Sequence, residues 1–212
     1  MCHYIVNKKL VDYIETMIIP RYADFDKGHN LEHVNTVINQ SLKLAAECNE
    51  NLEYAYVVAA YHDLGLCEGR EFHHIASGKI LEADSRLREW FSDKEIKLMK
   101  EAVEDHRASS KNPPRSIYGK IAAEADRDIV PLKIIKRTIQ YSINNNPSPD
   151  KESHWNDLVT HMAEKYSENG YMKLWFKNSK NAARLKELRT IIADKKHLRK
   201  IFEDLYLSLI HI

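Results

Sequence analysis

The stretch LEYAYVVAAYHDLG, residues 52–65, is apolar almost all round a helix and contains an adjacent histidine and aspartate near its end. A helix with apolar residues on nearly every side is a buried one, because a surface helix keeps a polar face. Gly65 follows directly and is suited to a C-terminal cap. We therefore expect residues 52–64 to form a central helix, with His62 and Asp63 at its buried end.

Apolar residues recur at helical spacing along nearly all of the remaining chain. Ser92 and Glu95 match a capping box, Pro131 fits a first helical turn, and Asp194 is suited to an N-cap. No alternating strand pattern of useful length occurs, so the sequence predicts an all-α fold. The other expected helices cover residues 8–19, stopped by Pro20, then 34–45, 73–89, 93–106, 117–129, 131–142, 152–168, 179–192 and 194–209.

The one linker-like stretch is NNNPSPD, residues 144–150. A chain of 212 residues can bury a sizeable core as one domain. We expect residues 1–143 to form a helical domain that carries the functional site. Residues 150–212 are predicted to be a C-terminal helical extension packed on the same core.

The composition narrows the partners and the compartment. Lys and Arg number 32 and Asp and Glu number 31, so bulk charge predicts no nucleic-acid polymer as a partner. The three cysteines form no CxxC motif, which fits a reducing compartment. No signal-peptide pattern and no apolar run able to span a bilayer occur, so we expect no membrane association and a cytoplasmic location.

Several histidines and aspartates fall where a solvated side chain has no reason to be. A buried and unpaired carboxylate such as Asp63 costs roughly 3–5 kcal/mol, which a cation removes. The plainer interpretation of His62-Asp63 alone is a packed histidine beside an exposed acid. Four inward-facing histidines and two aspartates on five helices are harder to explain in that way, and they supply the nitrogen and oxygen ligands that suit Mn, Fe, Zn or Mg. These residues are His33, His62, Asp63, His74, His106 and Asp126.

The order H…HD…H…H…D resembles the HD superfamily of phosphohydrolases, from about Tyr22 to Ile129. The opening motif reads HNLEHV, residues 29–34, and the closing one reads ADRD, residues 125–128. The resemblance implies an HD-domain helical bundle with a C-terminal helical extension. It also implies one divalent ion (Mn, Fe, Mg, Co or Zn), and its ligands would be His33, His62, Asp63 and Asp126.

Two further histidines are similar to motifs of the binuclear branch of that family. His74 precedes Gly78 by four residues, and His106 lies in the sequence EDHR, residues 104–107. By this resemblance Asp63 would bridge two ions, with His74 and His106 on the second. His73 could take the place of His74, because the sequence leaves open which ring points inward.

The resulting functional prediction is a phosphohydrolase that cleaves a phosphate ester or phosphoanhydride of a small nucleotide-like substrate through a metal-activated water. His62 and Asp63 are the expected catalytic residues at the ion. Arg70 and Arg107 are candidates to neutralise the phosphoryl oxygens, against the alternative that each is a solvated surface residue.

Two other interpretations stay open at this point. Some HD-fold proteins with a similar layout are di-iron oxygenases. A non-catalytic ligand-binding domain that keeps its metal only for stability would carry the same ligand pattern.

Overall fold

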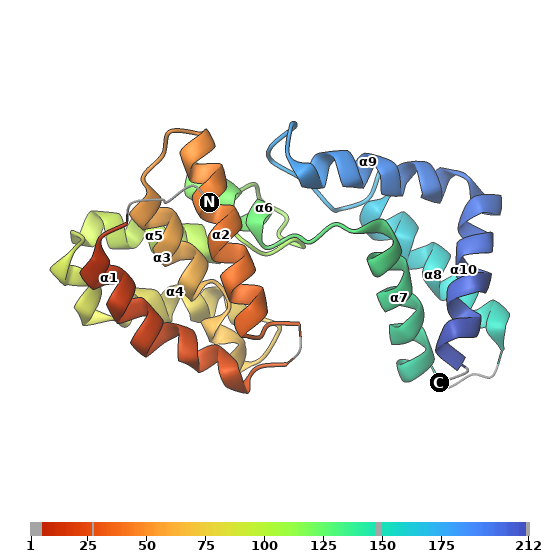
Figure 1. Ribbon diagram of the computed structural model, residues 1–212, viewed down its shortest axis with the longest axis horizontal. Coiled ribbons are helices and arrows are strands. Elements are labelled where there is room, and N and C mark those ends of the chain that lie inside the picture. The colour runs from red at the N-terminus through yellow and green to blue at the C-terminus, as the bar shows by residue number, and fades with distance from the viewer. Residues whose placement is uncertain (1–5, 27, 147–149, 211–212) are drawn as a thin grey trace. The chain divides into compact units, whose positions relative to one another are not determined.

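The computed structural model describes residues 6–26, 28–146 and 150–210, and within these ranges it contains helices and connecting segments but no strand (Figure 1). The predicted all-α fold is confirmed. None of the described helices is both long enough and apolar enough to cross a membrane.

The chain divides into two compact units, Met1–Arg127 and Asp128–Ile212. The predicted boundary, after residue 143, lies beyond this point. Helix α7 (Pro131–Asn145) packs on α8, α9 and α10 and therefore belongs to the second unit. The sequence could not show this, because the apolar face of an amphipathic helix does not reveal which other helices it packs against.

The first unit is built on α3 (Leu52–Tyr61), whose residues from Ala55 to Tyr61 are all buried. The other helices contact it or one another. They are α1 (Lys8–Tyr13), η1 (Ile14–Ile18), η2 (Ile19–Asp24), α2 (Leu31–Glu47), η3 (Leu64–Glu68), α4 (His73–Ala83), η4 (Ser85–Glu89), α5 (Asp93–Glu104) and α6 (Ile117–Ala125). Helix α3 packs against α2, α4, α5 and α6, so its end lies where several elements meet.

Two predicted helices are interrupted. The helix expected over residues 8–19 passes from α1 into the π-helix η1, and Pro20 lies in the first turn of the 3₁₀-helix η2 instead of ending a helix. The helix expected over residues 73–89 stops at Ala83. There the Asp84 carboxylate accepts the amide of Arg86 and the hydroxyl of Tyr61, at 3.0 and 2.5 Å, and so starts the separate turn η4.

Gly65 does not cap a helix in the left-handed conformation, as we had expected from its place after the His62-Asp63 pair. Among the described glycines only Gly69 has a positive φ. Gly65 is needed instead for close contact: a Cβ there would lie 2.2 Å from the carbonyl oxygen of His73 and 2.4 Å from the amide nitrogen of Ser77. Its own amide donates to the Ser77 Oγ at 2.8 Å. The missing side chain therefore brings α4 against the end of α3.

In the described part of the second unit four helices cluster together: α7, α8 (Lys151–Tyr166), α9 (Lys180–Ala193) and α10 (Lys195–Ile210). Buried residues such as Ile139, Met162 and Phe202 form its core. The predicted N-cap at Asp194 is confirmed, because its carboxylate accepts the amides of Lys196 and His197 at 3.0 Å each.

We predict that Gly65→Ala destabilises the protein by about 3 kcal/mol or more, because the added methyl group collides with backbone atoms that cannot turn aside. Thermal and denaturant unfolding of the full chain measure the change. In the matched variant Gly28→Ala the new Cβ meets only the end of the flexible Asp26 side chain, 3.1 Å away, so a loss below about 1 kcal/mol is expected. Equal losses in the two variants would show that the close contact is not what matters.

Candidate metal centre

The end of α3 places His62 and Asp63 side by side in the core. The His62 side chain is fully buried and Asp63 is 2% exposed. The His62 Nδ1 donates to the carbonyl oxygen of Ala59 at 2.7 Å, which turns Nε2 toward the Asp63 Oδ2, 3.1 Å away. Helical neighbours diverge by about 100°. The two side chains converge because the helix ends at Tyr61 and the backbone turns at Asp63.

One group of ligand atoms gathers His33, His62, Asp63 and Asp126, all within 4.8 Å of one another. The His33 Nε2 lies 3.2 Å from the His62 Nε2, 3.2 Å from the Asp126 Oδ1 and 3.6 Å from the Asp63 Oδ2. His33 stands in the first turn of α2, and the Asn30 side chain caps that turn by accepting the His33 amide. Asp126 follows the last residue of α6. The first turn of α2 and the ends of α3 and α6 thus contribute to this group.

A second group shares Asp63 and adds His73 and His106. The Asp63 Oδ1 lies 3.5 Å from the His73 Nε2 and 3.4 Å from the His106 Nε2, whereas its Oδ2 faces the first group. The two carboxylate oxygens of one residue therefore point into different ligand groups. This is the arrangement of a carboxylate that could bridge two ions.

His73, rather than the expected His74, belongs to the second group. His73 is the first residue of α4, and its Nδ1 bonds the carbonyl oxygen of Arg70 at 2.8 Å, which directs Nε2 toward His106. His74 is turned away by one helical step and lies outside both groups. Burial, followed by the positive charges around it, lowers the pKa of His74 to about 4, so it is a neutral side chain at physiological pH.

The orientation of three imidazoles shows that the site fits a cation. The Nδ1 atoms of His62, His73 and His106 all face backbone carbonyls, which only accept, so we assign the ring protons to Nδ1 and leave a lone pair on each Nε2. The Nε2 atoms of His73 and His106 are 3.1 Å apart, where two lone pairs repel. The Asp63 Oδ2 is buried and has no hydrogen bond to any described residue. These lone pairs and this carboxylate oxygen are satisfied when a proton or a metal ion lies between them.

The charges of the side chains at this centre support the same conclusion. Burial disfavours the charged form of His33, but the neighbouring carboxylates of Asp126 and Asp63 outweigh this effect and raise its pKa to about 9. Burial also opposes ionisation of Asp63, yet the surrounding histidines hold the pKa of that carboxyl well below its ordinary value. The carboxylates therefore remain ionised and draw protons onto nearby imidazoles. A divalent ion could replace those protons, and the His/Asp donor set suits one.

The two predicted arginines lie beside the centre. The Arg70 guanidinium is exposed and lies 3.4 Å from both ring nitrogens of His29, whose ring meets His33 edge to face. Arg107 donates to the carbonyl oxygen of Glu71. Burial, the charge of His106 and, to a smaller extent, that of Arg107 lower the pKa of His73, which places Arg107 near the second group.

Tyr22 is a supporting residue that the sequence did not reveal. Its buried hydroxyl donates to the Ala60 carbonyl at 3.0 Å and accepts the Asp63 amide at 3.3 Å, and its ring stacks on His62. Tyr22 thus holds the backbone on both sides of His62. In the sequence Tyr22 lies between the helices expected over residues 8–19 and 34–45, and one tyrosine in such a connection carries no signal of this contact.

Residues 30–129 match the family of the HD domain. Two solved structures are similar. Bacillus subtilis YpgQ, in complex with ADP, shares 17% identity over 92% of this chain and 95% of its own, with a TM-score of 0.56. A predicted HD superfamily hydrolase from an uncultured Thermotogales bacterium shares 18% identity over 74% of this chain and 87% of its own, with a TM-score of 0.49. No curated protein matches the chain.

The HD match spans both ligand groups, from His33 to Asp126. The likeness to YpgQ, at 17% identity, supports the fold alone. Together with the His/Asp centre, this match means that residues 30–129 of the chain form an HD domain.

Proposed function

We propose that this protein is a metal-dependent phosphohydrolase that uses water to cleave a phosphate ester or phosphoanhydride of a small nucleotide-like substrate. The observation that carries the proposal is the Asp63 carboxylate, which offers one oxygen to each of two ligand groups. Bound divalent ions would lower the pKa of water and polarise a phosphoryl oxygen.

The roles of the chain's own residues follow from their positions. His33, His62, Asp63 and Asp126 would hold the first ion, and His73 and His106 would complete the site of a second with Asp63. Hydrogen bonds to backbone carbonyl oxygens fix the rings of His62, His73 and His106, so little reorganisation is needed when an ion binds.

Arg70 and Arg107 would neutralise the phosphoryl oxygens. A guanidinium group presents donors in a fork that matches two oxygens of a phosphate. Arg70 is exposed, and among the described residues its guanidinium contacts only the side chains of Asp26 and His29, so it is free to turn toward a bound anion. The proposal therefore assigns the two arginines to substrate binding and not to the metal.

The proposed substrate class rests on two supports. The chain has almost equal numbers of acidic and basic residues, which favours a small substrate over a polymer held by bulk charge. YpgQ, which is similar in fold, was solved with ADP. A nucleotide is therefore the first substrate class to test.

The proposal is tested with protein purified without chelator. Elemental analysis gives the metal and its stoichiometry, and Mn²⁺, Co²⁺ or Fe²⁺ protein is then assayed for phosphate or pyrophosphate release from a nucleotide panel. A di-iron oxygenase, which the shared carboxylate would also suit, would instead consume oxygen after anaerobic reduction and iron loading. Absence of both activities, with metal bound and stability dependent on it, would favour a non-catalytic domain.

Asp126→Ala should lower the metal content of the first group and reduce phosphate release at least about 100-fold, because the ion loses a direct ligand. Metal stoichiometry and kcat are the measurements. The matched control is Asp128→Asn, since Asp128 is an exposed carboxylate in an ion pair with Lys133. It should leave both quantities unchanged. Retention of full metal content by Asp126→Ala would remove that residue from the proposed ligand set.

Replacing His73 and His74 one at a time tests which of these neighbours is a ligand of the second group. A general effect of substitution on folding would lower the metal content in both variants. His73→Ala should lower the metal-to-protein ratio by removing one of three ligands, whereas His74→Ala should preserve it. Elemental analysis after equilibrium dialysis reads the ratio directly. The opposite pattern would restore His74 as the ligand.

Metal affinity should rise with pH up to about 9. In the metal-free protein His33 is protonated below a pKa of about 9, and an ion binds only the neutral ring, so binding releases that proton. The association constant should therefore increase up to about tenfold per pH unit between pH 6.5 and 8.5 and then level off. Competition with a chelating indicator measures it, and an affinity that does not change with pH would contradict the assignment.

A further inference from the structure

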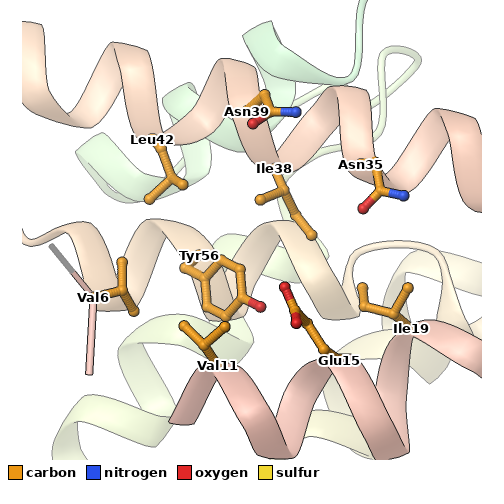
Figure 2. Close-up of a pocket in the computed structure, with 9 residues that line it drawn as sticks. All are labelled: Val6, Val11, Glu15, Ile19, Asn35, Ile38, Asn39, Leu42 and Tyr56. Atoms are coloured by element: carbon orange, nitrogen blue, oxygen red, sulfur yellow. The ribbon is translucent and has the colours of Figure 1, made fainter. Parts of the chain in front are cut away.

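A hollow in the first unit lies apart from the candidate metal centre. It has a volume of about 430 Å³, within the range of small-molecule sites, and lies between the N-terminal helical segment, α2 and α3 (Figure 2). Val11, Ile38 and Leu42 line its apolar part. None of the metal-binding candidates is among its lining residues. The two sites are therefore separate.

Two polar groups of this cavity have no hydrogen-bond or ion-pair partner among the described residues. The Glu15 carboxylate and the Tyr56 hydroxyl point toward the same part of the hollow, as Figure 2 shows. Neither side chain has a hydrogen-bond or ion-pair partner in the parts of the chain that the structure describes, although Tyr56 is 5% exposed. The Glu15 side chain is exposed and open to water at the mouth of the cavity, whereas most of the Tyr56 side chain is buried. These two groups are therefore available to something that enters the cavity.

The charged and polar groups that line the cavity determine which polar group of a ligand would fit there. Burial and, to a smaller extent, the negative charge of Glu15 raise the pKa of the Tyr56 hydroxyl, so it stays neutral at physiological pH and its oxygen can accept a hydrogen bond. A carboxylate and a hydroxyl oxygen together complement an ammonium group, which has donors only. An anion would be repelled by Glu15, and Asn35 at the rim carries no charge to offset that repulsion.

We propose that this cavity binds a small organic amine, with its ammonium group between Glu15 and Tyr56 and its apolar body on Val11, Ile38 and Leu42. The apolar body follows from the lining side chains and the ammonium group from the unpaired acceptors. The inference does not depend on the proposed phosphohydrolase activity, because it uses no residue of the metal centre.

The test uses benzylamine as the probe and ¹H–¹⁵N spectra of the full chain. A ligand of this size should bind with a dissociation constant on the order of 1 mM and shift the amides around Glu15 and Asn35. Benzyl alcohol, which is neutral, and benzoate, which is anionic, should bind at least about tenfold more weakly. Equal binding of the three probes, or no saturable shift with benzylamine at about 20 mM, would overturn the proposal.

Variants locate the binding. Glu15→Gln should weaken benzylamine binding about tenfold by removing the charge, and Leu42→Trp should abolish it by filling the cavity. Glu47→Gln removes an exposed carboxylate of α2 that does not line the cavity, and it should bind as the unaltered protein does. The dispersion of the same spectra shows whether Leu42→Trp is folded. If it is not, Glu15→Gln alone decides, and unchanged affinity in that variant refutes the site.

Discussion

The carboxylate of Asp63 is the charge on which the first unit depends. It is 2% exposed, in a core where an uncompensated carboxylate costs roughly 3–5 kcal/mol. His62, His73 and His106 surround it, and each is tied through Nδ1 to a backbone carbonyl. These rings cannot turn away without losing that bond. The burial of Asp63 is therefore stable only while protons or a cation lie among the ligand atoms.

The residues that pack the end of α3 therefore also fix the positions of the ligand atoms. The Tyr22 hydroxyl joins the Ala60 carbonyl to the Asp63 amide and so holds the end of α3. Gly65 lets α4 come within backbone contact of that end, and this approach brings His73 to Asp63. A change at either position would act on the ligand atoms through the backbone, without touching a ligand.

Helix α2 takes part in the candidate metal centre with one face and in the cavity of Glu15 and Tyr56 with the opposite face. His33 and Asn35 are two residues apart, which places their side chains about 200° apart around the helix axis. His33 therefore faces the ligand group, whereas Asn35 lines the cavity. An occupant of the cavity would rest on the same rigid element that positions a proposed metal ligand.

Apolar periodicity was enough to predict the helical class, and the inward-facing polar residues were enough to select His33, His62, Asp63, His106 and Asp126, which the structure brings together. Local signals also placed the Asp194 cap, because a cap depends on its own turn. The choice of His73 over His74, the role of Tyr22 and the unit boundary after Arg127 came from packing. Each of these features depends on which helices contact one another and on how each helix is rotated about its axis. These contacts join residues that are far apart in the chain, so no local sequence pattern predicts them.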